Sequence, residues 1–534
     1  MATISLTQLY SNLNSWPGNL FRYEPGLTVN TQTATSYSFT YPASGVNFPD
    51  YRVVITGTGF QYDAGVAIGG TMSQLRILDG TGATVLTFGG LTPNTLASDF
   101  AQFYANFFGS EFLPGEGQGP DSKQTWSHLM SGNDTIIGTQ GDDWQGIVGL
   151  DQGNDLYNMR NGDDFINGGM GNDTINGGNG FDILSYEQTT YNEGLPAFRG
   201  VSINVVTGRA LDPWGGTDRF SGIEEFRGSR FNDTFIGGVD RDRFAGLRGR
   251  DTIDGGNNSY DATGTIKTDD RRDEVSYQSD YWGGGLRGII VDLETNANPS
   301  SIRGTIRDGF GNLDTVIDIE RVIGTRFDDV FVGSRINNGF SGGEGIDSYD
   351  GGADSDFIDF GRYFGNSAPA GVVVDLARAN GQVQNDGFGN VETAINIEEL
   401  RGGDQNDRFS GNAAGNFFEG RQGADVMTGR GGSDQFFWYE QAELGDGDRV
   451  TDFTATGPAA DKLAFEVANF TGMTGTALVV NGTAATQNLG TFIYNAANDT
   501  LSWDRDGTGG ALAVAVVVLT NVASLSSANF DLFV

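Results

Sequence analysis

Residues 168–186 read GGMGNDTINGGNGFDILSY, in which the pattern G-x-D-x-apolar occurs twice, nine residues apart. The same register continues on both sides in four blocks, with steps of nine residues except before Asp155 and Asp273. A fixed short period is the signature of a repeat architecture. We call its 18 positions the register residues: Asp134, Asp143, Asp155, Asp164, Asp173, Asp182, Asp233, Asp242, Asp251, Asp273, Asp329, Asn338, Asp347, Asp356, Asp407, Asn416, Asp425 and Asp434.

An apolar column accompanies the register. Two positions after each register residue the side chain is apolar or aromatic in 17 of 18 cases, and Gln145 is the exception. A solvated Gly/Asp-rich linker has no reason to keep apolar residues in phase. The pattern predicts a brief strand in each unit, with one side chain pointing inward.

The residue types of the unit predict its shape. Glycines allow tight turns and positive φ, so nine residues give a turn and a strand, and two units make one coil with strands on two sides. Stacked coils bury the apolar column between two sheets. Each Asp then lies at a turn, just before a strand, where stacked carboxylates and carbonyls form an all-oxygen anionic site that suits calcium.

These residues resemble a known family. GGMGNDTIN (168–176) is similar to the nonapeptide G-G-x-G-x-D-x-U-x of the repeats-in-toxin (RTX, haemolysin-type) calcium-binding family, and 177–185 and 429–437 are near matches. The resemblance implies a right-handed parallel β-roll or β-solenoid, with several Ca²⁺ ions held between successive turns by the register carboxylates and turn carbonyls. Asn338 and Asn416 depart from the pattern because they lack the charge.

Composition excludes several classes of function. The 534-residue chain carries a formal net charge of −37, with no Cys and one His. Thiolate metal sites, multi-His zinc sites and His-based triads are therefore excluded or improbable, and nucleic acid is an unlikely partner for so acidic a surface. The chain has neither an H-E-x-x-H nor a G-x-S-x-G motif. It has no apolar run long enough for a membrane span, and we assign no catalytic residue.

The sequence also has a longer period of about 75 to 95 residues, and each such period contains one block of nonapeptides and one inserted segment. Strand-like segments GVSINVV (200–206), GIIVDLE (288–294) and GVVVDLA (371–377) are each followed by a polar loop and by IEEFRG, IERVIG or IEELRG. The spacing predicts a continuous solenoid with decorated coils. The inserted loops either bind a ligand or a neighbouring protein, or are neutral decoration.

Three domains are expected in this mainly β protein. Residues 1–125 lack the period and predict a small α+β or β-rich domain, with a hairpin at Ile77–Phe88 and an amphipathic helix at 94–108. Residues 126–440 form the roll. Residues 441–534 predict a β-rich cap and resemble the C-terminal portion of RTX proteins and serralysin-type proteases, which implies an uncleaved signal for a type I export apparatus. The first 20 residues show no secretory signal peptide, in agreement with that route.

The sequence therefore favours a secreted calcium-binding structural protein of the bacterial cell surface or extracellular matrix. Calcium would fold the repeats outside the cell, and residues 1–125 would mediate attachment or assembly into a homo-oligomer, filament or sheet. One alternative is a calcium-dependent adhesin that binds glycans or other cells. A second is an enzyme that acts on a polysaccharide through carboxylates alone.

Overall fold

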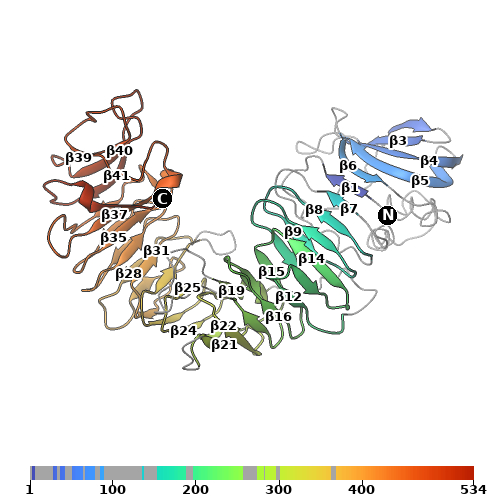
Figure 1. Ribbon diagram of the computed structural model, residues 1–534, viewed down its shortest axis with the longest axis horizontal. Coiled ribbons are helices and arrows are strands. Elements are labelled where there is room, and N and C mark those ends of the chain that lie inside the picture. Colours follow the sequence, from blue (N-terminus) through green and yellow to red (C-terminus); the bar gives the residue numbers. More distant parts are fainter. Residues whose placement is uncertain are drawn as a thin grey trace. The chain divides into compact units, whose positions relative to one another are not determined.

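The computed structural model describes residues 153–187, 197–256, 273–281, 283–295, 301–361 and 368–533, together with the backbone of strands within 3–89 and 135–137 (Figure 1). The chain divides into two compact units, Met1–Asn257 and Asn258–Val534. Each unit is described by itself.

The N-terminal unit begins with antiparallel strands. In the order of their pairing these are β2 (Thr28–Gln32), β3 (Ser36–Tyr41), β4 (Tyr51–Asp63), β5 (Val66–Leu78), β6 (Thr84–Gly89) and β1 (Thr3–Leu6). The antiparallel pair β5 and β6 confirms the predicted hairpin, whereas the predicted helix at 94–108 lies outside the described residues. β1 also pairs in parallel with β7 (Thr135–Ile137), the first strand of the repeats.

The repeats of this unit form two sheets. Consecutive strands alternate between them, so each strand pairs in parallel with the strand two units on, as Thr174 does with Leu156. The predicted coil of two nonapeptides is therefore confirmed. The first sheet contains β7, β8 (Leu156–Asn158), β10 (Thr174–Asn176), β16 (Thr234–Ile236) and β18 (Thr252–Asp254), and the second contains β9 (Phe165–Asn167), β11 (Ile183–Ser185), β15 (Glu225–Arg227) and β17 (Arg243–Ala245).

One inserted segment widens only the first sheet. The chain runs through β12 (Ser202–Asn204), β13 (Arg209–Leu211) and β14 (Thr217–Ser221), which pair antiparallel in sequence. β14 then lies parallel to β10, and β12 lies parallel to β16. Between β10 and β16 the first sheet thus contains three strands, whereas β15 alone separates β11 from β17 in the second.

The C-terminal unit repeats this plan. Its second sheet consists of β19 (Glu274–Ser276), β23 (Arg321–Ile323), β25 (Gly339–Ser341), β27 (Phe357–Asp359), β31 (Glu399–Arg401), β33 (Phe417–Glu419), β35 (Gln435–Trp438), β37 (Lys462–Glu466) and β42 (Phe530–Phe533), all parallel. The first-sheet side contains β24 (Val330–Ser334), β26 (Ser348–Gly352), β30 (Thr393–Ile395), β32 (Arg408–Ser410), β34 (Val426–Thr428) and β36 (Arg449–Val450).

Two further inserted segments decorate this unit. The first consists of β20 (Ile290–Asp292), β21 (Arg303–Arg307) and β22 (Leu313–Ile317), and the second of β28 (Val373–Asp375) and β29 (Val383–Asn385). β20 and β28 are the β-branched stretches predicted as strands, and each pairs in parallel with a repeat strand.

A β-rich segment follows the last repeat. It contains β38 (Val479–Asn481), β39 (Thr491–Asn495), β40 (Thr500–Asp504) and β41 (Val514–Leu519), and β41 pairs in parallel with β36. The ring centroid of Phe492 lies 4.9 Å from that of Phe465 and 4.5 Å from that of Phe530. Short 3₁₀ helices complete the unit: η3 (Gln278–Asp280), η4 (Gln441–Glu443), η5 (Val467–Asn469) and η6 (Ser527–Asn529).

The core of both units is the predicted apolar column. Every column side chain among the described residues is at most 2% exposed, which confirms the period: Tyr157, Ile166, Ile175, Leu184, Phe235, Phe244, Ile253, Val275, Phe331, Phe340, Tyr349, Ile358, Phe409, Phe418, Met427 and Phe436. Ile136 and Gln145 lie outside the described side chains.

Candidate metal sites

Tight glycine turns place the register carboxylates. Gly180 has a φ of 133°, a value that favours glycine over all other residues. At Gly177 a side chain would overlap the Gly222 carbonyl oxygen and the Asp182 carboxylate. Main-chain and carboxylate oxygens therefore face the same small space, which only a residue without Cβ leaves open.

The register residues of the N-terminal unit form two ladders. The main-chain N–H of a register residue donates to a carboxylate one coil further on, as Asp155 N does to Asp173 Oδ1 at 2.7 Å. The other turn repeats the contact between Asp164 N and Asp182 Oδ1 at 2.9 Å. Asp233 N donates in the same way to Asp251 Oδ1 at 2.8 Å. One carboxylate oxygen of each acceptor thus forms a hydrogen bond that links adjacent coils.

The C-terminal unit has the same two ladders. Its donor and acceptor pairs, with N to O distances, are Asp329–Asp347 (2.8 Å), Asn338–Asp356 (2.6 Å), Asp407–Asp425 (2.7 Å) and Asn416–Asp434 (2.8 Å). Two described register residues remain, one in each unit. In the N-terminal unit Gly238 N donates to Asp242 Oδ2 at 2.6 Å, and in the C-terminal unit Asp273 N donates to Glu320 Oε2 at 3.0 Å. Asp134 and Asp143 lie outside the described side chains.

Seven ladder acids were missed by the nine-residue register. They accept the N–H of a register residue where an insertion or the C-terminal segment interrupts the repeat: Asp218, Glu224, Glu320, Glu392, Glu398, Asp448 and Asp461. The sequence did contain a signal. Glu224, Glu320 and Glu398 are the Glu of the three Ile-Glu motifs, whose spacing marks the longer period.

The two register asparagines are satisfied within the protein. Asn338 Oδ1 accepts the N–H of Ser334 at 2.6 Å, and its amide nitrogen donates to the Glu320 carbonyl at 3.4 Å. Asn416 makes the equivalent contacts with Asn412 N and the Glu398 carbonyl. These neutral side chains complete the ladder without adding charge.

Several ladder carboxylates keep one oxygen without any partner. Asp173, Asp182, Asp356 and Asp425 are fully buried, and the Oδ2 atom of each has no hydrogen-bond partner. A buried carboxylate oxygen without a partner is costly unless a cation or a proton meets it. The free oxygens face the turns, so the donor set is one that a hard oxygen-seeking cation fits.

Burial raises the pKa of these acids. Loss of hydration, together with neighbouring carboxylates, raises the pKa of Asp173 and of Asp218 to about 8. The same causes raise the pKa of Asp356 to about 8 and that of Asp425 to about 9. Without a cation the folded protein therefore holds protons that the unfolded chain, with an Asp pKa of about 4, has released at neutral pH.

We expect the calcium-free fold to become less stable as pH rises. The folded state binds more protons than the unfolded state between about pH 4 and the raised pKa of Asp425, about 9, so the free energy of unfolding falls with pH across this window. Thermal unfolding in excess chelator should give a midpoint that falls between pH 5 and pH 6.5, and at pH 8 the folded baseline should be lost. A midpoint that rises with pH would contradict this account of the ladders.

Carboxylates alone do not form a complete metal site. Among the described residues, no group of three or more acidic or His side chains is placed to share one metal ion. A cation at these turns must therefore combine the carboxylates with main-chain carbonyls. The oxygens of Gly222 and Asp182 that face Gly177 show both kinds of donor at one turn.

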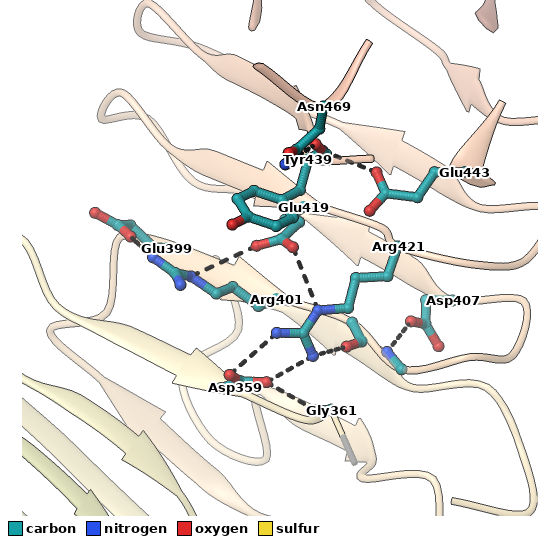
Figure 2. Close-up of polar contacts among 12 residues, drawn as sticks. Asp359, Gly361, Glu399, Arg401, Asp407, Glu419, Arg421, Tyr439, Glu443 and Asn469 are labelled. Atoms are coloured by element: carbon teal, nitrogen blue, oxygen red, sulfur yellow. Dashed lines mark hydrogen bonds and ion pairs between the residues drawn. The ribbon is translucent and has the colours of Figure 1, made fainter. Parts of the chain in front are cut away.

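A different charge arrangement covers the outer face of the second sheet (Figure 2). Arg421 donates to both carboxylate oxygens of Asp359, at 2.8 and 3.1 Å, and to Glu419 at 3.3 Å. Arg321 reaches the same Asp359 at 2.8 Å. Burial raises the pKa of Asp359, but the two guanidinium groups outweigh it and hold the pKa well below its usual range. Here the protein supplies its own cations, in contrast to the free oxygens of Asp173, Asp182, Asp356 and Asp425 at the turns.

Comparison with known families agrees with the geometry. Four segments match the family described as RTX calcium-binding nonapeptide repeat: residues 130–144, 151–184, 218–259 and 401–436. The matches leave out 329–356, where the structure shows the same ladder contacts. No curated protein matches the chain. In the part of the chain that the structure describes, no helix is long and apolar enough to cross a membrane. The chain therefore carries RTX calcium-binding nonapeptide repeats, folded as a parallel two-sheet solenoid.

Proposed function

We propose that the protein is a secreted structural component of the bacterial cell surface or extracellular matrix, whose repeats fold when calcium fills their turns. The observation that carries the proposal is the set of buried carboxylate oxygens without partners at Asp173, Asp182, Asp356 and Asp425. When no cation is bound, the carboxylates of the two ladders repel one another and so oppose folding. A divalent cation removes both the charge repulsion and the unmet oxygens.

The calcium ligands of this proposal are the acidic register residues and the seven ladder acids. At Asp173, Asp182, Asp356 and Asp425 one carboxylate oxygen accepts the N–H of the preceding coil, which leaves the other oxygen for the ion. The contact to the preceding coil fixes the side chain before any ion arrives. Asn338 and Asn416 contribute no charge, and their side-chain oxygens, which already accept a main-chain N–H, add only weakly to calcium binding.

Calcium-dependent folding fits export in an unfolded state. Intracellular calcium is too low for sites of the extracellular class, whose dissociation constants are roughly 10⁻⁴ to 10⁻³ M, so the repeats would stay unfolded until the chain leaves the cell. Residues 441–534 would carry the signal for a type I export apparatus. Residues 1–125 would mediate attachment or self-association.

The ligand assignment is tested by Asp356→Asn. The amide oxygen keeps the bond from Asn338 N, while the charge and the free Oδ2 are lost. We expect the calcium concentration at the folding midpoint to rise above the range of roughly 10⁻⁴ to 10⁻³ M that is usual for such sites. Asp354→Asn is the matched control, because Asp354 is an exposed acid in the same turn. Equal midpoints for the two variants would remove Asp356 from the ligands.

The structural role is tested by assembly. Electron microscopy and light scattering of the full chain, with and without calcium, should show calcium-dependent filaments, sheets or defined oligomers. A monomer in both conditions would overturn the assembly part of the proposal. In that case glycan binding would favour an adhesin, and the release of reducing ends from a polysaccharide would favour an enzyme.

A further inference from the structure

The three inserted segments share an acidic pattern that is separate from the nonapeptide. Each contains acids six residues apart, and the last two of each set are ladder acids or their counterparts: Asp212, Asp218 and Glu224; Asp308, Asp314 and Glu320; Asp386, Glu392 and Glu398. The first acid closes a tight loop. Asp308 Oδ1 accepts Phe310 N at 3.1 Å and Asn312 N at 2.6 Å, and Asp308 Oδ2 accepts the Asn312 side chain at 2.8 Å.

The second of the three insertions, which contains β20, β21 and β22, has an additional acid beside it. This acid is Asp280 of η3, which precedes β20 in the chain. This side chain is 1% exposed, although it lies outside both the register and the ladders. Its Oδ2 atom accepts the N–H of Gly309 at 2.8 Å. Its Oδ1 atom is buried and has no hydrogen-bond partner, and no Lys or Arg among the described residues forms an ion pair with it. A free carboxylate oxygen in this position is unexplained by the loop geometry alone.

The surroundings of Asp280 are strongly negative. Its carboxylate interacts with those of Asp308, Asp314 and Asp329, and all three neighbours are at most 1% exposed. The hydroxyl of the buried Tyr277 donates to Asp314 Oδ2 at 2.9 Å and so orients that group. Four buried carboxylates in one region require neutralisation, because buried charges are tolerated only when they are paired or bind a metal.

We propose that Asp280 and Asp314 bind a calcium ion within the second insertion, at a site distinct from the nonapeptide turns. Asp308 and Asp329 add negative charge. Because no three acidic side chains here are placed to share one ion, main-chain carbonyls and water complete the ligand set. Calcium suits such an irregular all-oxygen site better than magnesium, which demands near-ideal octahedral geometry.

The ion would fasten η3 to the inserted hairpin of β21 and β22. Asp280 contacts the loop at Gly309 and lies 34 residues before Asp314 in the chain. The other two insertions contain the six-residue pattern, and among the described residues the third insertion has a buried oxygen without a hydrogen-bond partner at Glu392. That oxygen belongs to a ladder acid, whereas Asp280 lies outside the ladders, so Asp280 is the position at which the two classes of site can be separated.

The test is calcium stoichiometry in Asp280→Asn. The asparagine keeps an oxygen for Gly309 N and removes the charge. Equilibrium dialysis with calcium should show one ion fewer per chain than in the wild type, and terbium luminescence excited through tyrosine should fall, since Tyr277 contacts the site. Asp292→Asn, on β20 of the same insertion, should leave both readings unchanged. Asp280→Glu restores a carboxylate and should recover terbium binding at least in part.

The outcome that overturns the proposal is equally specific. If Asp280→Asn binds as many calcium ions as the wild type and its calcium-free form is more stable, a proton rather than a cation neutralises Asp280. Circular dichroism in saturating calcium shows whether each variant is folded, and a misfolded Asp280→Asn leaves the Asp280→Glu comparison to decide. The inference rests on the proposed function only for calcium binding itself. A wild-type chain that binds no calcium would end both, whereas unchanged stoichiometry in Asp280→Asn ends only this one.

Discussion

Removal of calcium at pH 8 is expected to unfold the repeats. The ladder acids lose their counter-ions, and raised pKa values of about 6 for Asp182 and about 8 for Asp356 show that burial disfavours their charged forms. At a calcium concentration ten times the dissociation constant, each bound ion stabilises the fold by about 1.4 kcal/mol. Summed over many sites, this exceeds the usual stability of a domain, about 5–15 kcal/mol.

Circular dichroism during a calcium titration measures this directly. In excess chelator the β signal should be lost, and it should return cooperatively over the concentration range of roughly 10⁻⁴ to 10⁻³ M that extracellular sites use. Magnesium at the same concentrations is the control and should restore much less of the signal. A full β spectrum in chelator at pH 8 would show that the ladders are stable without ions.

Phe418→Ala is expected to have the largest effect among single substitutions of the core. Phe418 is fully buried between the two sheets, with its ring centroid 6.1 Å from Phe409 and 5.7 Å from Phe436. Truncation of a buried Phe leaves a cavity and costs about 3–5 kcal/mol. Because each coil contacts mainly its neighbours, the cavity should weaken the coupling between the coils on its two sides, so that they unfold less cooperatively.

The matched control is the preceding residue. Phe417 belongs to the same strand, but its side chain lies on the outer face of the second sheet, half-buried beside Phe437 at 5.4 Å between ring centroids. Phe417→Ala should therefore cost about 1 kcal/mol, the usual size of a single-mutation effect. Guanidinium unfolding in saturating calcium distinguishes the two, and similar losses would contradict the assignment of Phe418 to the column.

Much of the fold could be predicted from the sequence because its period is local. A turn of fixed length places one apolar residue inward and one acid at the turn in every unit, so spacing alone identified Ile175, Phe331 and their equivalents as core. The alternation of strands between two sheets was predicted from the same spacing, because two nine-residue units make one coil. The domain boundaries at 125 and 440 stay predictions.

The rest depends on contacts that no short period encodes. Asp173 N finds its acceptor on Asp218, 45 residues away, because an insertion moves the next coil along the chain without moving it in the sheet. Arg421 meets Asp359 across 62 residues, a partner that residue type alone does not specify. Burial of Asp280 likewise arises from the packing of η3 on the inserted hairpin.

The unequal strand count at the first insertion acts as a wedge. Between β10 and β16 the first sheet holds two strands more than the second sheet does between β11 and β17. Strands lie about 4.8 Å apart, so one side of the coil stack is locally longer by about 10 Å. Two faces of unequal length favour local curvature of the stack at this insertion, with the first sheet on the longer side. The position of an inserted hairpin thus determines where curvature is favoured in an otherwise uniform repeat.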